Sequence, residues 1–204
     1  PWLLQQYKTH KTKSYKIRKS DQTPAMNNKV VYFPSCINQT MGLAKDSPVD
    51  QPLVKQMLSL LQKAGYEVIF PPKMEKLCCG TIWESKGMLD IADSKSTELE
   101  ASLWEASEQG RYPVLCDQSP CLHRMRATIQ KIKLYEPAEF IYTFLRDKLE
   151  FTPTDRPIAI HITCSMRKMG LANILISLAK LCSTQVFIPE EIGCCGFAGD
   201  KGFT

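Results

Sequence analysis

Leu77-Cys78-Cys79-Gly80 and Gly193-Cys194-Cys195-Gly196 are two copies of one short motif, in which two adjacent cysteines precede a glycine. A single cysteine that ends an apolar run comes before each copy, Cys36 in the first half and Cys164 in the second. On a strand, adjacent side chains point to opposite faces, whereas in a turn that enters a helix two sulfurs can converge on one metal or bridge two. A disulfide between neighbours would be strained. We therefore predict that the chain contains a repeat and that both pairs are metal-ligand turns.

The composition is typical of a globular protein with reduced thiols. The 204 residues are 44% hydrophobic, which is enough for one full core or two small ones. The sequence shows no signal-peptide pattern and no apolar run long enough to span a bilayer, so we expect neither a leader nor a membrane span. Nine cysteines without a secretory signal favour a reducing compartment, where grouped thiols more often bind metal than form disulfides. We expect a cytoplasmic protein, at most peripheral at the inner face of a membrane.

Excess positive charge is confined to the start of the chain. Residues 1–20 hold six Lys or Arg and no acidic residue. The rest of the chain holds the other 20 of the 26 basic residues and all 21 acidic residues, so its net charge is close to zero. A basic run in an irregular segment is usually solvated. We therefore interpret residues 1–28 as a linker or extension and predict no nucleic-acid partner.

From residue 29 onward, apolar strand patterns alternate with helical ones. We predict helices between the strands, at 52–64, 88–108, 119–130, 138–149 and 168–181, with the first paired-cysteine turn opening the helix at 88–108. The strands are expected at 29–33, 66–70, 112–116, 132–135, 157–163 and 184–188. This alternation indicates an α/β fold with right-handed crossovers and parallel sheets. Because the order restarts after a polar turn, we predict two tandem units, 29–152 and 153–204, each with a small parallel sheet flanked by helices and the second one truncated.

Eight of the nine cysteines lie at the ends of predicted strands or just after them. Ligands of parallel sheets usually bind at this edge, where the helices begin. Thiolate-rich sites with few histidines favour zinc or an iron-sulfur cluster over hard cations. The ninth cysteine, Cys182, is better explained as a small buried hydrophobe inside a helix. The metal-ligand candidates are therefore Cys36, Cys78, Cys79, Cys116, Cys121, Cys164, Cys194 and Cys195.

Four longer motifs surround these cysteines, at residues 32–36, 117–121, 161–170 and 194–203. With them, residues 29–204 resemble the CCG cysteine-rich domain family. That family occurs in heterodisulfide reductase, in the small subunit of anaerobic glycerol-3-phosphate dehydrogenase, in glycolate oxidase iron-sulfur subunits and at the carboxyl end of large FAD-linked dehydrogenases. The motifs are most similar to those of fused FAD and iron-sulfur D-lactate dehydrogenases.

The resemblance implies two cluster sites of the four-iron type, which are non-cubane in heterodisulfide reductase. The first would use Cys36, Cys78, Cys79 and Cys121, and the second Cys164, Cys194 and Cys195, with its closing cysteine expected beyond residue 204. The spacing of Cys116 departs from the family pattern, so it is either a fifth ligand or a strand-end residue. A cluster short of a ligand is labile, and zinc can take its place.

The resemblance also implies a function in electron transfer. FAD on an upstream domain would oxidise a D-2-hydroxy acid, D-lactate first, and electrons would pass through a ferredoxin-like segment and this region to a quinone or cytochrome. No catalytic triad, phosphate loop or dinucleotide fingerprint is present in the sequence, so we predict no catalytic or flavin-binding residue and an inactive fragment. The alternatives are a zinc-stabilised interaction module, or the same redox module serving glycolate, 2-hydroxyglutarate, glycerol-3-phosphate or a heterodisulfide.

Four other side chains near the predicted ligand loops have more than one interpretation. His161 is expected to pack or hydrogen-bond near the sheet rather than bind iron. His123 is either a donor to sulfur or a surface residue. Arg124 either offsets cluster charge, receives an acidic substrate or partner, or belongs to a solvated helix face. Trp83 either caps the first site or packs in the core.

Overall fold

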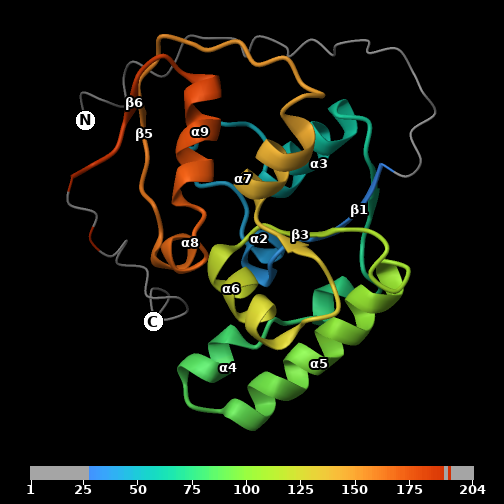
Figure 1. The fold of residues 1–204 in the computed structure, drawn as a ribbon. Helices are drawn as coiled ribbons and strands as arrows, with labels where there is room; N and C mark the ends of the chain where they lie inside the picture. The colour runs from blue at the N-terminus through green and yellow to red at the C-terminus, as the bar shows by residue number, and fades with distance from the viewer. Residues whose placement is uncertain (1–27, 191–192, 194–204) are drawn as a thin grey trace.

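A four-stranded parallel sheet forms the centre of the computed structural model, which describes residues 28–190 and 193 (Figure 1). Every pair of neighbouring strands is parallel, which confirms the predicted α/β fold. The strands, in their order across the sheet, are β2 (Glu67–Ile69), β1 (Lys29–Phe33), β3 (Val114–Cys116) and β4 (Leu134–Tyr135).

Helices cover both faces of this sheet, and β1 is buried between them (Figure 1). Val30 and Tyr32 pack on one face with α3 (Leu53–Lys63) and α7 (Pro137–Phe140). Val31 and Phe33 pack on the other face with α5 (Leu89–Ala106) and α6 (Ser119–Thr128). A parallel strand that is covered on both faces has no solvent side, which explains the continuous apolar run of β1.

The strand order creates a topological switch point between β1 and β3. The chain leaves β1 through α3 to reach β2 on one side, and α5 then carries it back past β1 to β3 on the other side. In the register of the sheet, Phe33 at the end of β1 is paired with Cys116 at the end of β3. The loops that follow these two strands therefore start side by side, at the edge where parallel sheets bind ligands.

A second, two-stranded parallel sheet holds β5 (Ile158–Ala159) and β6 (Val186–Phe187). Its core packs Ile160 and Ile162 against α8 (Cys164–Lys168) and α9 (Ala172–Cys182). Ala138 of α7 is part of this core as well, and α8 packs on α6. The second sheet and its helices thus rest directly on helices of the first.

The predicted helices differ from the observed ones mainly where a glycine interrupts them. The paired-cysteine turn opens a separate short helix, α4 (Thr81–Ser85), and Gly87 with φ of +76° separates it from α5. Gly170 with φ of +73° likewise separates α8 from α9. Other elements beyond the prediction are α2 (Cys36–Thr40), the 3-10 turn η2 (Met74–Lys76) and a π-helical turn η3 (Ile141–Leu145) that continues α7. Elements of three to five residues are too short to show a helical period.

Candidate metal centre

Cys36 is the first residue of α2, in the loop that leaves β1. Its neighbour Ser35 caps the helix, because Ser35 Oγ accepts a hydrogen bond from the backbone N–H of Asn38 at 3.3 Å. The backbone N–H of Ser35 donates to Oδ1 of Asp117 at 2.8 Å, and the hydroxyl of Tyr32 donates to Oδ2 of the same carboxylate at 2.7 Å. Asp117, which follows β3, therefore ties the Cys36 loop to the neighbouring strand.

The turn Cys78-Cys79-Gly80 lies between β2 and α4 and is held by its backbone. The carbonyl oxygen of Cys79 accepts hydrogen bonds from Oγ of Ser96 at 3.2 Å and from Nε of Arg124 at 3.1 Å. Gly80 has a φ of +85°, and a Cβ on it would lie 2.9 Å from Nε of Arg124 and would run into the carbonyl oxygen of Ala92. Only glycine fits this position without strain.

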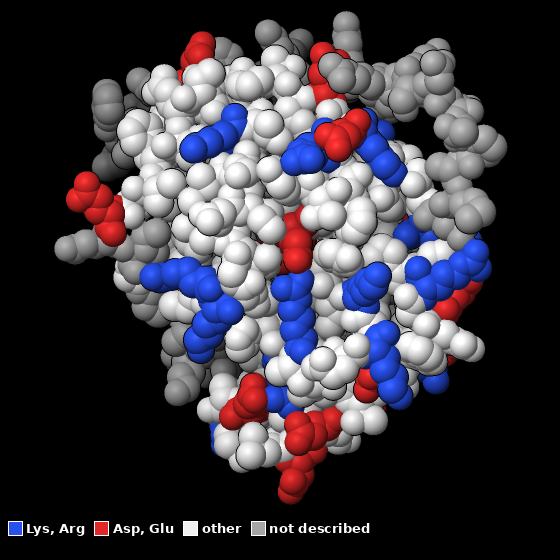
Figure 2. Space-filling view, viewed as in Figure 1, with Lys and Arg blue, Asp and Glu red and all other residues white. Residues whose placement is uncertain are grey.

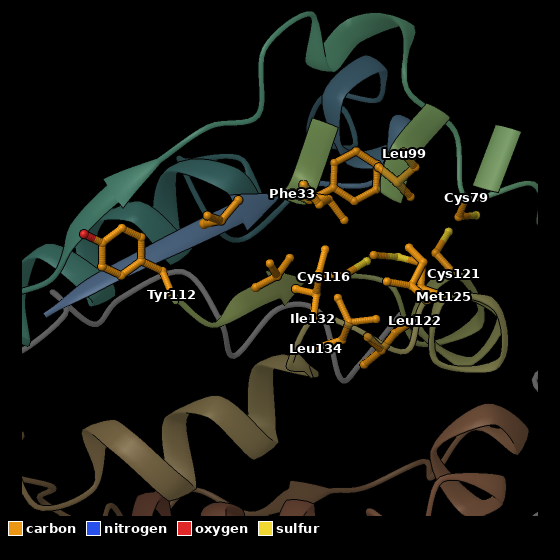
Figure 3. Packing of buried hydrophobic residues seen from close by; sticks show 14 residues of the cluster. Phe33, Cys79, Leu99, Tyr112, Cys116, Cys121, Leu122, Met125, Ile132 and Leu134 are labelled. Atoms are coloured by element: carbon orange, nitrogen blue, oxygen red, sulfur yellow. The ribbon is translucent and has the colours of Figure 1, made fainter. Parts of the chain in front are cut away.

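Two further cysteines reach the same region from β3 and α6. Cys116 is the last residue of β3 and is completely buried, and Cys121 is buried in the first turn of α6. Both belong to the apolar cluster that holds Cys79 and Met125. Figure 3 shows Cys79 and Cys121 near one another at one end of this cluster.

A series of interactions between these thiols shifts their pKa values. The hydrogen bond with Cys121 is the largest cause that raises the pKa of Cys79, to about 12. The pKa of Cys78 is raised first by its hydrogen bond with Cys79 and then by burial. Burial raises the pKa of Cys36, and the nearby Cys78 raises it further. Thiols with raised pKa values are protonated at neutral pH, so metal binding here would release protons.

The fifth thiol of this region, Cys116, lies apart from the series. Burial is the largest cause that raises its pKa well above the ordinary value, and its Sγ lies 3.9 Å from the carbonyl oxygen of Gln118. Cys79 acts on it electrostatically. Both interpretations of Cys116, a ligand or a strand-end residue, are compatible with this position.

The structure thus brings together five of the eight predicted ligands, although their binding of metal stays a prediction. All seven cysteines in the described part of the chain are free thiols. Within residues 28–190 and 193, no three His, Cys, Asp or Glu side chains form a group that could hold a single metal ion. The donor set itself is soft sulfur from several loops, which fits an iron-sulfur cluster.

Cys164 of the second predicted site occupies a position like that of Cys36. It is exposed, it is the first residue of α8, and Oγ1 of Thr163 caps this helix by accepting from the backbone N–H of Met166 at 3.3 Å. Its predicted partners Cys194 and Cys195 lie outside the described residues.

Three of the four ambiguous side chains are now placed. Arg124 is buried, which excludes a solvated helix face among its alternatives. His161 is exposed between the buried Ile160 and Ile162, so it does not pack in the core, and the expectation that it does not bind iron stays a prediction. His123 is half-buried on α6.

Two residues that shape the site, Asp117 and Ser96, were missed as functional candidates. Asp117 was visible in the sequence as a polar residue directly after the third strand, whereas nothing in the sequence distinguishes Ser96 from the other polar residues of α5. Trp83, the fourth ambiguous residue, is half-buried on α4.

The fold and the site define an α/β protein with a group of thiols at the carboxyl edge of a parallel sheet. The family model described as "Cysteine-rich domain", named CCG, matches residues 30–126 and 158–204. The chain therefore belongs to the CCG cysteine-rich domain family, as its motifs predicted. No curated protein and no solved structure matches the chain. In the described part, none of the helices has the length and apolar character needed to cross a membrane.

Proposed function

We propose that this chain is the iron-sulfur electron-transfer region of an FAD-linked D-2-hydroxyacid dehydrogenase, with D-lactate as the first candidate for the substrate of the whole protein. Membership of the cysteine-rich family supports the redox role. The substrate assignment rests on the motifs at 32–36, 117–121, 161–170 and 194–203. In this proposal, an upstream FAD domain and a ferredoxin-like segment deliver electrons, and a quinone or a cytochrome accepts them.

One observation carries the redox role: the segments that follow β1, β2 and β3 at one edge of the parallel sheet carry four cysteines, and two of them, Cys79 and Cys121, pack in one buried cluster. Cys36, Cys78, Cys79 and Cys121 are the residues that would hold a cluster. A four-iron cluster supplies one-electron transfer when bound, and the protein tunes it through burial and hydrogen bonds to sulfur. The corresponding thiols of the second site would be Cys164, Cys194 and Cys195.

The chain itself contributes orientation and exclusion of water. Asp117 orients the Cys36 loop, and Arg124 together with Ser96 orients the paired-cysteine turn. Cys79 and Cys121 are buried, which keeps solvent away from their sulfur atoms. A dry environment protects thiolates from oxidation and strengthens nearby electrostatic interactions.

Anaerobic reconstitution with iron and sulfide tests this proposal. The loaded chain is expected to contain iron and acid-labile sulfide, to absorb visible light and to give an electron paramagnetic resonance signal after oxidation or reduction. Cys79→Ser should lose most of the signal. Cys182→Ser is the matched control, because Cys182 is a half-buried cysteine of α9 outside the ligand loops, and this variant should load like the parent chain.

The opposite result is equally well defined. A colourless chain that keeps stoichiometric zinc and loads no iron, with or without Cys79, would contradict the electron-transfer role. It would favour the zinc-stabilised interaction module instead. Cys116→Ser in the same experiment decides whether Cys116 is a ligand, since only a ligand's loss should change the spectrum.

A further inference from the structure

Arg124 is a buried arginine directly behind the paired-cysteine turn. Its side chain, on α6, is only 5% exposed. A buried guanidinium is costly unless its N–H groups meet acceptors. The identity of those acceptors therefore indicates what the burial of Arg124 stabilises.

Three groups from three segments surround the guanidinium. Nε donates to the carbonyl oxygen of Cys79 at 3.1 Å, Nη2 donates to Asp93 of α5 at 2.8 Å, and Nη1 lies 2.5 Å from Oε1 of Glu84 on α4. The side chains of Glu84 and Asp93 are 48% and 70% exposed. Ion pairs with such exposed carboxylates contribute little by themselves, so the buried bond to Cys79 is the more informative contact.

The surface near Arg124 is acidic, and this negative charge is what a buried cation requires. Figure 2 shows acidic side chains gathered at the lower end of the visible face, over α4 and the start of α5. Glu84, Asp90 and Asp93 belong to these two helices. The positive charge of Arg124 is therefore neutralised from the solvent side, while its Nε faces the turn.

The position of Arg124 on α6 couples the turn to Cys121. Residues three apart on a helix lie on the same face, and Cys121 and Arg124 have this spacing. Arg124 thus binds the backbone of Cys79, while Cys121, one helical turn earlier, lies near Cys79 in the same buried cluster (Figure 3). Gly80 makes this close approach possible, because any Cβ there would press on Nε of Arg124.

We propose that Arg124 is a positioning residue of the first thiol site, which holds the carbonyl group of Cys79 and thereby keeps the Cys79 thiol against Cys121. The orientation of the turn is a property of the chain itself. The effect on a bound cluster rests, in addition, on the proposed function.

Hydrogen-deuterium exchange of the metal-free chain tests the orientation. In Arg124→Met, amides of residues 77–84 should exchange at least about tenfold faster, the factor for one lost hydrogen bond to a charged group. Amides of β3, residues 114–116, should keep their rates. Arg126→Met is the matched control, because Arg126 lies on the same helix but bonds Leu134 and Glu139, and it should leave 77–84 unchanged.

Arg124→Lys covers the case in which the methionine variant does not fold. Lysine keeps the positive charge but lacks the planar guanidinium group that reaches three partners. The amides of residues 77–84 should therefore still exchange faster than in the parent, by a smaller factor than in Arg124→Met. No acceleration in 77–84, or equal acceleration in 77–84 and 114–116, would overturn the proposal. The second result would assign Arg124 to general stability.

The midpoint potential of the reconstituted chain provides a measurement that a purely structural role would not move. Arg124→Met removes a positive charge and should shift the potential downward. The double variant Glu84→Gln/Asp93→Asn keeps Arg124 but removes its counter-charges and should shift the potential upward. Unchanged potentials in both variants would overturn an action of Arg124 on the site. Failure to load any cluster would contradict the proposed function, and the exchange experiment would still decide about Arg124.

Discussion

The loops of Cys36 and Cys164 are built alike, but their surroundings differ. Each cysteine is the first residue of a five-residue helix, and the hydroxyl residue before it, Ser35 or Thr163, caps that helix at 3.3 Å. Around Cys36, however, β1 pairs with strands on both of its edges, while β5 pairs with β6 in its two-stranded sheet. Asp117 of the β3 loop binds the first loop.

This difference distinguishes the local conformation of the single-cysteine loop from the arrangement of the other thiols near it. The conformation of the single-cysteine loop is local, because a serine or threonine before the cysteine is enough to cap the short helix. The gathering of thiols is not local, because Asp117, Cys121 and Arg124 all come from β3 or the segment after it. Cys36 and Cys164 are both exposed, and the described part of the chain differs around them in that residues of the β3 segment bind the Cys36 loop and bring the buried Cys121 to the same edge of the sheet.

The largest effect is expected from Gly80→Ala, compared with Gly170→Ala in the second region. Both glycines have φ near +80°, at +85° and +73°, and alanine is strained there by about 1–2 kcal/mol. A Cβ on Gly80 additionally meets Ala92 and Arg124, whereas Gly170 faces open space. We expect a loss of about 3 kcal/mol in the free energy of unfolding for Gly80→Ala and about 1 kcal/mol for Gly170→Ala.

Urea denaturation of both variants measures these losses. Gly87→Ala is a control within the first region, because Gly87 has φ of +76° and open space around it, and it should behave like Gly170→Ala. Equal losses at Gly80 and Gly170 would mean that the close packing behind the paired-cysteine turn does not constrain it.

The next largest effect is expected from Asp117→Ala, which removes the connection between the Cys36 loop and the β3 segment. The hydroxyl of Tyr32 and the backbone N–H of Ser35 would both lose their acceptor, at a cost of about 2–3 kcal/mol. A double-mutant cycle with Tyr32→Phe separates the two bonds, because the phenylalanine variant no longer needs an acceptor. If Asp117→Ala costs the same in the Tyr32→Phe background, the tyrosine bond contributes nothing.

A smaller effect, equal in both regions, is expected when the caps are removed. Ser35→Ala and Thr163→Ala should each cost about 1 kcal/mol, the ordinary value for a helix cap. Thermal denaturation of the two variants checks this equality. A much larger loss for Ser35→Ala would show that the first loop depends on more than its cap, and the two loops would then not be equivalent even locally.

The sequence predicted the sheets better than the short helices. The apolar run at 29–33 and the alternation after it were sufficient to predict the parallel strands, because parallel strands need helical crossovers. The five-residue helices at Cys36, Thr81 and Cys164 were missed, since five residues show no period. Gly87 and Gly170 were the available signals for the breaks that follow two of them.

The sequence predicted which cysteines come to the edge of the sheet, but not the residues that support them. Strand ends are positions that a pattern reveals, and the repeated motif marked the cysteines among them. The function of Arg124 depends on Asp93 and Cys79, which are 31 and 45 residues away in the chain. Such contacts follow from the packing of α4 and α5 on α6, which periodicity in one segment cannot predict.

The smallest effect concerns α7, where the two regions meet. Ala138 of α7 packs in the core of the second region and Phe140 in the core of the first. Glu136 caps this helix, with its carboxylate accepting from the backbone N–H of Ala138 at 2.6 Å. Burial is the largest cause that raises the pKa of Glu136, and the neighbouring Glu139 adds to it.

A raised pKa in the folded state means that folding favours the protonated form of Glu136. Its contribution to stability is therefore fully present below its pKa in the unfolded chain and is lost as the pH rises through its folded pKa. Glu136→Gln keeps an acceptor for Ala138 without the charge. We expect this variant to be at least as stable as the parent at pH 7 and to lose that advantage at pH 4.

Urea denaturation at the two pH values measures this difference. Glu105→Gln is the control for net charge, because Glu105 is an exposed residue of α5. If Glu136→Gln is clearly less stable than the parent at pH 7, the ionised carboxylate is needed for the cap despite its burial. The contact between α7 and both cores would then depend on that charge, and the two regions would be coupled electrostatically as well as through packing.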